Sequence, residues 1–547
     1  MNKLKLLIFP ILLLAAVSCK KETVVPEPFS LTQVQVNGKP GSSTFNEVNL
    51  APEIKLKFSA PVDRNSVRTS ITFNAGSTTR PYDVTYESND SIVNITPNLP
   101  LEYLSRYSIH VMKDLVSTQL TGIETEYNIV LFTAIDTNDK FPRVTDNELL
   151  TLIQQKTFTY FWDFGHPVSG MARERNTSGD LVTTGGSGFG VMAILVGIER
   201  NFITREQGLQ RLLTLVDFLK NKTTRYHGAL PHWLNGATGV TIPFGNTDNG
   251  ADLVETSYML QGLITARQYF SSPTNAGEIQ LRSTINALWN EVEWDWFRKN
   301  NENALYWHWS PTNGWAMNMR VQGYNEALIV YVLAASSTTH TITKTVYENG
   351  WAMNGNIRLN QSYFGYLLPL GQSYGGPLFF AQYSFLGLDP RSLHDQYASY
   401  WQQNVSHSLI NYSYCVANPN GFAGYSKNCW GLTASDIPSG YSASSPTNDV
   451  GVIAPTAAIS SLPYCPTESM QAIRFFYYKL GDKIWKNYGF VDSFSQKELW
   501  FADTFLAIDQ GPEIVMIENY RTGLLWNLFM SAPEVQAGLT KLGFSYK

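Results

Sequence analysis

The stretch that decides the fold runs from residue 246 to residue 264 and reads NTDNGADLVETSYMLQGLI. It begins as a polar, glycine-containing loop and continues as a segment that we expect to be helical. Most sides of that helix are apolar, through Leu253, Val254, Tyr258, Met259, Leu260, Leu263 and Ile264. A helix that is apolar nearly all round is buried inside a large domain. The stretch therefore predicts a helical domain that surrounds this segment.

Helix-like segments continue on both sides of this stretch. The first opens with Thr145 and Glu148, a capping box in which two side chains satisfy backbone amides. Others lie near 187–200, 204–220, 276–297, 324–337, 340–351, 374–386, 391–412, 453–462, 466–481, 511–530 and 532–542. About twelve such segments joined by long structured loops favour a closed ring of six helix pairs, an all-α (α/α)6 toroid, over residues 145–547. No fixed-period repeat supports a solenoid.

Residues 29–135 have a different pattern, typical of an Ig-like β-sandwich. Ile54–Phe58 alternates apolar and polar residues, and Val67–Phe73 also reads as a strand. About seven such strands, separated by turn-rich spacers, suit a sandwich. The segment FSAPVD at 58–63 resembles bacterial Ig-like domains, which usually serve as spacers or modest binding modules. Residues 136–144 are the expected linker, so the chain is predicted to be multidomain.

Tryptophan marks the same boundary. None of the 14 tryptophans precedes Trp162. Charged residues make up 16% of the chain, against a usual value of about 25%. The net charge of −5 comes without a basic block, so a nucleic-acid partner is not expected. A weakly charged chain rich in Trp and Tyr suits a neutral ligand with many hydroxyl groups.

The N-terminus has the pattern of an export signal. Lys3 and Lys5 precede an apolar run, 6–17, that is shorter than the roughly 20 residues of a membrane span. The following Ser18 and Cys19 resemble the end of a bacterial lipoprotein signal, with Cys19 as the lipidated residue. We therefore expect a signal peptide over 1–18, a tether over 19–28, and an exported, monomeric lipoprotein of the outer membrane. Simple secretion is the alternative, and which membrane face the protein occupies is left open.

The sequence lacks the motifs of several common kinds of functional site. Eight scattered histidines without an HExxH or CxxC pattern predict no metal site and no cofactor. No nucleophile elbow, phosphate-binding loop or dinucleotide fingerprint occurs. Export permits disulfides, but Cys415, Cys429 and Cys465 leave the pairing open.

Carboxylates are the best remaining catalytic groups. Asp252 and Glu255 are three residues apart and share one helix face, and burial would raise a carboxyl pKa there. Capping of the helix fits the same spacing equally well. Glu326 precedes a second apolar run, 327–335, with no Lys or Arg within four residues. Favourable interaction with a helix dipole is the alternative for Glu326.

Other polar and aromatic residues are candidates for binding sugar hydroxyls and sugar faces. Asp163, Arg173, Glu174 and Arg175 lie in glycine-containing loops, where they either hold hydroxyl groups or pair with one another. Trp233, beside His232, is a candidate stacking platform. Trp315 belongs to an aromatic-rich region in which some rings must be core.

Six motifs carry a family resemblance. They are FWDFGHP at 161–167, DNGADLVE at 248–255, GYNE at 323–326, QSYGGPLF at 372–379, DQGP at 509–512 and IENYRTGL at 517–524. Together they resemble the glucoamylase-like family of Bacteroidetes glycoside hydrolases, whose characterised members include β-1,2-glucanases. The resemblance spans 145–547 and implies an (α/α)6 toroid that cleaves β-1,2-glucan with inversion. It matches Asp248, Asp252, Glu255 and Glu326 to the family's acidic positions, and its motifs add Tyr374 and Gln510 as substrate-binding candidates.

Inversion needs a general acid and a general base about 6.5–9.5 Å apart. Asp252 and Glu255, one helical turn apart, are expected to be too close, so one of them should face Glu326. Glu255 or Glu326 is then the acid, and Asp252 holds substrate or water. The alternatives are an exo-acting β-gluco-oligosaccharide hydrolase that releases a disaccharide, a non-catalytic glycan-binding lipoprotein and a toroid lyase. The main expectation is endo cleavage of β-1,2-glucan, with exact linkage and endo or exo cleavage left open. A proton path relayed through the substrate also fits these residues.

Overall fold

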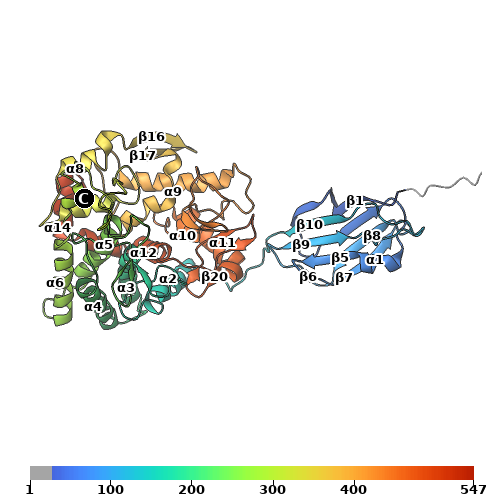
Figure 1. Ribbon diagram of the computed structural model, residues 1–547, viewed down its shortest axis with the longest axis horizontal. Helices are drawn as coiled ribbons and strands as arrows, with labels where there is room; N and C mark the ends of the chain where they lie inside the picture. Colours follow the sequence, from blue (N-terminus) through green and yellow to red (C-terminus); the bar gives the residue numbers. More distant parts are fainter. Residues whose placement is uncertain (1–27) are drawn as a thin grey trace, which may run out of the picture. The chain divides into compact units, whose positions relative to one another are not determined.

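The computed structural model describes residues 28–547, which divide into two compact units between Asp136 and Thr137 (Figure 1). The predicted signal peptide, Cys19 and nearly all of the tether lie outside the described residues. Among the described helices, none is long and apolar enough to cross a membrane. Cys415, Cys429 and Cys465 are buried free thiols, so the structure forms none of the disulfides that the sequence permitted.

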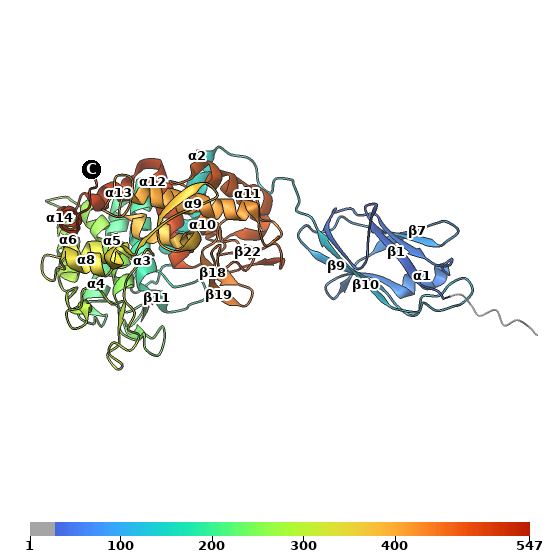
Figure 2. The same cartoon turned by 90° about the horizontal axis from the view of Figure 1, so that it is seen from above.

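The N-terminal unit contains two five-stranded sheets, seen as separate layers in Figure 2. One has the order β2-β1-β4-β8-β7, with bounds Lys39–Gly41, Leu31–Val36, Ile54–Phe58, Ile92–Pro97 and Tyr82–Glu87. The other has the order β3-β10-β9-β5-β6, with bounds Thr44–Val48, Tyr127–Thr133, Arg106–Val111, Ile71–Ala75 and Thr78–Thr79. In β4, Ile54, Leu56 and Phe58 are buried while Lys57 is exposed, the expected period of two.

The expected strand over Val67–Phe73 was wrong in its first half. Residues Arg64–Ser70 form helix α1, and strand β5 begins only at Ile71. The helix begins there because the Asp63 carboxylate accepts the Asn65 N–H, an N-cap that overrides the β-branched residues.

The second unit is mainly helical. Its helices are α2 (Asp146–Trp162), α3 (Thr184–Glu199), α4 (Arg205–Asn221), α5 (Leu253–Tyr269), α6 (Ala276–Asn290), α7 (Leu328–Ser336), α8 (Lys344–Asn349), α9 (Tyr400–Ala417), α10 (Pro455–Ile459), α11 (Pro466–Ile484), α12 (Ala507–Thr522), α13 (Leu524–Met530) and α14 (Pro533–Leu542). Figure 1 shows α5 and α12 inside the unit and α6 at its edge. The Thr145–Glu148 capping box is confirmed at the start of α2.

Helices α3 and α5 pack backbone against backbone. A Cβ added at Gly188 would lie 2.2 Å from the Tyr258 carbonyl oxygen, and one added at Gly262 would lie 2.1 Å from the Gly188 carbonyl oxygen. Only glycine permits this approach. The contact therefore fixes the first turn of α5, which carries Glu255, against the start of α3.

The helices expected over 374–386 and from residue 391 were wrong in detail. The first is broken into short 3-10 turns, Ser373–Gly375 (η3), Leu378–Ala381 (η4) and Tyr383–Leu386 (η5). Tyr374, Gly375 and Gly376 have positive φ values of 60°, 93° and 83°, which end a right-handed helix. Helix α9 begins only at Tyr400, well after Pro390.

Candidate active site

A cavity of about 740 Å³ opens in the helical unit. Five of the acidic residues singled out from the sequence line it: Glu174, Asp248, Asp252, Glu255 and Glu326. They come from separate loops and from the helix α5, so folding brings together residues that are far apart in the chain. Arg175 and Trp233 line the same cavity.

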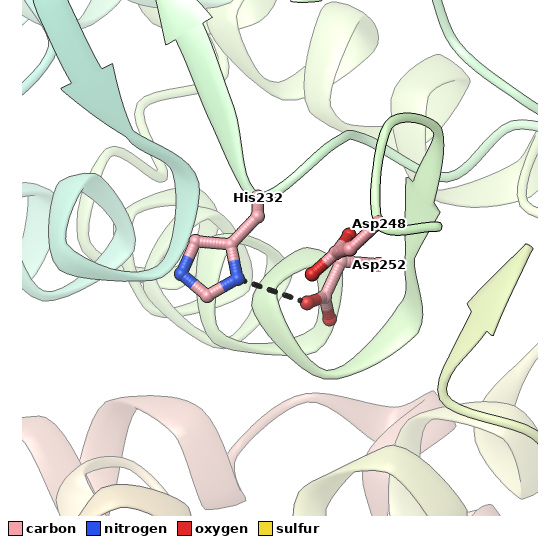
Figure 3. Close-up of side chains that lie close together, drawn as sticks. All are labelled: His232, Asp248 and Asp252. Carbon is pink, nitrogen blue, oxygen red and sulfur yellow. Dashed lines mark hydrogen bonds and ion pairs between the residues drawn. The ribbon is translucent and has the colours of Figure 1, made fainter. Parts of the chain in front are cut away.

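Asp252 is both a helix cap and a charged member of the site. One carboxylate oxygen accepts the N–H groups of Val254 (3.0 Å) and Glu255 (2.9 Å) at the start of α5. The other lies 3.2 Å from His232 Nδ1 (Figure 3). It also lies 3.4 Å from His308 Nε2. Burial would raise the pKa of Asp252, but the two imidazoles outweigh burial and hold it below its ordinary value. The ionised form of Asp252 is therefore favoured.

Two histidines complete this cluster. Burial lowers the pKa of His232, but the charges of Glu255, Asp252 and Asp248 overcome this and raise it to about 9. His308 Nε2 also lies 3.4 Å from the Asp248 carboxylate, and its pKa is raised by Asp252 and Asp248 against the effect of burial. His232 is therefore positively charged near neutral pH, and the two aspartates favour the protonated form of His308. Burial and the Asp252 charge raise the pKa of Asp248.

Glu255 reaches from α5 to the start of α3. Its Oε2 accepts the Gly185 N–H at 2.6 Å and lies 3.4 Å from the Thr183 hydroxyl. A Cβ at Gly185 would lie 2.7 Å from this oxygen, so glycine makes room for the carboxylate. Burial raises the pKa of Glu255, while the cationic His232 and the Gly185 amide oppose the rise.

Glu326 lies just before α7, which begins at Leu328. Its backbone carbonyl accepts hydrogen bonds from the Ser384 hydroxyl and, at 3.3 Å, from the Tyr258 hydroxyl. Burial, with smaller contributions from the charges of Asp252 and Glu255, raises the pKa of Glu326 to about 7. A carboxyl group with this pKa can donate a proton at neutral pH.

His232, Asp248 and Asp252 could in principle hold a metal ion, since one possible ligand atom from each lies within 4.8 Å of the others (Figure 3). Metal binding requires a neutral imidazole. The neighbouring carboxylates favour a protonated His232, so a cation would have to displace that proton. Hydrogen bonds to both Asp252 oxygens hold the cluster together without a metal ion.

The other predicted binding residues do not line the cavity. Asp163 is exposed at the C-terminus of α2. Arg173 donates to the backbone carbonyls of Phe164, Gly165 and Gly179. Trp315 packs against Trp296 and Tyr306, and Tyr374 against Tyr363. Gln510 is buried and donates to the Phe490 carbonyl. Contact of these five residues with substrate stays a prediction.

The alternatives for Glu174 and Arg175 were to hold sugar hydroxyls or to pair with each other, and their positions allow both. They line the cavity, yet Arg175 also forms ion pairs with Glu174 at 2.9 Å and with Asp436 at 3.2 Å.

Comparisons with known proteins place this site in a family. A family model described as "Putative glucoamylase" matches residues 318–533, and a bacterial Ig-like domain model matches residues 33–134. The structure of an endo-β-1,2-glucanase from Chitinophaga pinensis is 52% identical, with a TM-score of 0.72. The match covers 74% of this chain and 99% of that chain. The chain belongs to the glucoamylase-like family.

Two relatives of this glucoamylase-like chain come from Parabacteroides distasonis. A β-1,2-glucanase structure is 38% identical with a TM-score of 0.71, and the match covers 94% of this chain and 73% of that chain. An exo-β-1,2-glucooligosaccharide sophorohydrolase (non-reducing end) is 46% identical over 422 residues. That match covers 73% of this chain and 58% of the relative, so the chain spans little more than half of that protein's length.

His232 and His308, which form ion pairs with the acidic cluster, were not among the predicted site residues. Each stands beside tryptophan, in His232-Trp233 and in Trp307-His308-Trp309, so a local signal existed. Phe244, Tyr383 and Tyr441 also line the cavity of the glucoamylase-like unit but have no local motif. Their positions depend on how distant loops fold together.

Proposed function

We propose that this chain is an inverting glycoside hydrolase that cleaves β-1,2-glucan at internal linkages. The observation that carries the proposal is that one cavity is lined by Asp252, Glu255 and Glu326, and that the pKa of Glu326 is raised to about 7. A protonated carboxyl and a carboxylate are the two groups that inversion requires. The β-1,2 linkage is supported by the Chitinophaga and Parabacteroides relatives, which are β-1,2-glucan hydrolases.

Glu326 is the general acid in this proposal and Glu255 is the general base. Burial and, to a smaller extent, the charges of Asp252 and Glu255 raise the pKa of Glu326 and favour its protonated form. Burial raises the pKa of Glu255 too, but the cationic His232 and the Gly185 N–H oppose that rise, whereas no cation lies among the groups that shift Glu326; this difference supports Glu255 as the base. Asp252 orients His232 and the start of α5, and Asp248 contacts substrate hydroxyls. The glucan's neutral hydroxyls match a lining of carboxylates and imidazoles, and no cofactor is needed.

We also propose that the helical unit is an (α/α)6 toroid. A closed series of contacts runs from α3 to α5, α7, η5 and α12 and returns to α3. Outer helices pack against members of this series, as α2 does on α12, α6 on α5 and α14 on α7. This arrangement supports a ring with the acidic cavity at one end of its inner helices.

Incubation with linear β-1,2-glucan tests the activity, with reducing ends and the anomeric configuration of the products followed over time. A mixed ladder of oligosaccharides with inverted configuration is expected. A single disaccharide product would favour the exo-acting alternative suggested by the sophorohydrolase. No turnover of any β-glucan by folded protein would overturn the proposal.

Glu326→Gln separates a hydrolase from a glycan-binding lipoprotein. Loss of the general acid should lower kcat by about 10²–10⁴-fold. Glu498→Gln is the matched control, because Glu498 is exposed and pairs only with its neighbour Lys497 among the described ion pairs. It should leave kcat unchanged. Equal activity of both variants would remove Glu326 from the mechanism.

We further propose export as an outer-membrane lipoprotein anchored through Cys19, with 29–135 as an Ig-like spacer, 136–144 as a linker and 145–547 as the catalytic domain. The export-signal pattern of residues 3–19 supports this. Cys19→Ala should move the protein from the membrane fraction to the soluble fraction. An unchanged membrane fraction would count against the anchor.

A further inference from the structure

The mouth of the cavity carries an apolar surface that the acid and base do not use. Phe244, Met317 and Met319 line the cavity and leave 52%, 38% and 44% of their surface exposed. They come from two loops, one before α5 and one before α7. Apolar side chains gathered at the mouth of a cavity are typical of a ligand-binding surface.

The ring of Phe244 has a defined orientation. It stacks on His232 with a centroid distance of 4.2 Å and an interplanar angle of 22°. It also lies against Trp233, at 4.6 Å and 60°. His232 in turn contacts the Asp252 carboxylate at 3.2 Å. Phe244 thus contacts the acidic cluster through the His232 ring, and about half of the Phe244 surface is exposed to solvent.

The backbone around Phe244 is held as firmly as the ring. The Phe244 N–H donates to the Asp248 carbonyl at 2.9 Å, and the Gly245 N–H donates to the same carbonyl at 3.2 Å. The side-chain amide of Asn313 donates to the Asn246 carbonyl at 3.0 Å and joins the two loops. A surface fixed before binding loses little conformational entropy when a ligand arrives.

We propose that Phe244 is a stacking platform for one glucosyl ring of the substrate, beside the ring whose linkage is cleaved. The proposal rests on the function proposed above. A β-linked glucopyranose has equatorial hydroxyl groups, so its two faces are made of C–H bonds and suit a flat apolar surface. Met317 and Met319 extend this surface, while the hydroxyls at the ring edge can reach Asp248.

Kinetics of Phe244→Ala and Phe244→Trp on β-1,2-glucan test the platform. Loss of the ring should raise KM about tenfold, equivalent to about 1.4 kcal/mol, and leave kcat within about twofold. Phe244→Trp should restore KM to within about threefold. Phe364→Ala is the matched control, because Phe364 is 46% exposed in the helical unit but does not line the cavity. It should change neither constant.

Binding measured without turnover tests the platform separately from the proposed hydrolysis. Calorimetric titration of Glu326→Gln with β-1,2-linked oligosaccharides, from disaccharide to hexasaccharide, should give affinities about tenfold weaker when Phe244→Ala is added. If Phe244→Ala leaves both KM and affinity within about twofold, the platform is wrong even if the enzyme hydrolyses the glucan. If the wild type does not hydrolyse it but the affinity still depends on Phe244, only the proposed hydrolysis fails. A fall in kcat with unchanged KM and affinity would make Phe244 a support for His232 and overturn the platform.

Discussion

The Asp252 carboxylate separates two roles between its two oxygens. One caps α5 through two backbone N–H groups, and the other faces two imidazoles. Capping needs only a hydrogen-bond acceptor, which asparagine also supplies. The ion-pair cluster needs negative charge. A comparison of asparagine and alanine at this single position can therefore separate the effect of the cap from the effect of the charge.

Asp252→Asn should lower the free energy of unfolding by about 3 kcal/mol at neutral pH, because it keeps the cap but removes the buried counter-charge of the imidazoles. Asp252→Ala should lower it by about 1–2 kcal/mol further. Both should lower kcat/KM at least about tenfold, because His232 and His308 lose their counter-charge. Urea unfolding and glucan hydrolysis give the two readings. Full activity in Asp252→Asn would reduce Asp252 to a helix cap.

The pKa of Glu326 predicts the alkaline limit of activity. Glu326 must be protonated to act as the acid, and its pKa is raised to about 7. On the alkaline side, kcat/KM should therefore fall tenfold per pH unit as pH rises through this value. Rate measurements with subsaturating glucan check this. A constant kcat/KM well above pH 7 would show that Glu326 is not the acid.

At the scale of elements, the close packing of α3 and α5 positions the site. Glu255 projects from α5 to the Gly185 amide in the first turn of α3. A change in the separation of the two helices would therefore move this carboxylate relative to its hydrogen-bond donor, even if the change lay one or two turns away.

Gly262→Ala tests this packing. The added Cβ would lie 2.1 Å from the Gly188 carbonyl oxygen, so the helices must separate. We expect a loss of about 2–4 kcal/mol in unfolding free energy, together with lower kcat. Gly277→Ala in α6 is the control, since its nearest contact would be the flexible end of Leu209 at 3.2 Å. It should stay within about 1 kcal/mol of the wild type. Equal stabilities of the two variants would contradict the backbone contact.

Sequence patterns predicted elements best where packing and periodicity agree. The capping box placed the start of α2, and the apolar run after residue 252 placed α5. They failed where one local contact overrides the pattern. The Asp63 cap turns part of an apparent strand into α1, and positive φ values at 374–376 break an apparent helix.

At the scale of the whole molecule, all cavity-lining residues belong to the unit Thr137–Lys547. The Chitinophaga structure, matched over 99% of its length, corresponds to 74% of this chain, so that relative folds with fewer residues. The helical unit therefore contains every group that the proposed reaction uses.

A protein limited to residues 137–547 should keep kcat/KM for soluble β-1,2-glucan within about twofold of the full chain, because no group of the proposed reaction is lost. Parallel rate measurements on both proteins check this, with circular dichroism confirming that the shorter one is helical. A large loss of activity in a folded helical unit would show that the Ig-like unit takes part in catalysis.

The sequence by itself determined the two kinds of domain, the buried helix α5 and the four acidic positions now found in the cavity, because periodicity, capping and family motifs are local properties of a chain. It left Asp252 divided between capping and charge, and it did not show that Arg173, Tyr374 and Gln510 lie outside the lining of the cavity. Only the tertiary structure decided these points. A carboxyl pKa depends on burial and on charges contributed by distant segments, such as His232 and His308 around Asp252. Whether a side chain meets substrate or backbone likewise depends on which loops fold beside it.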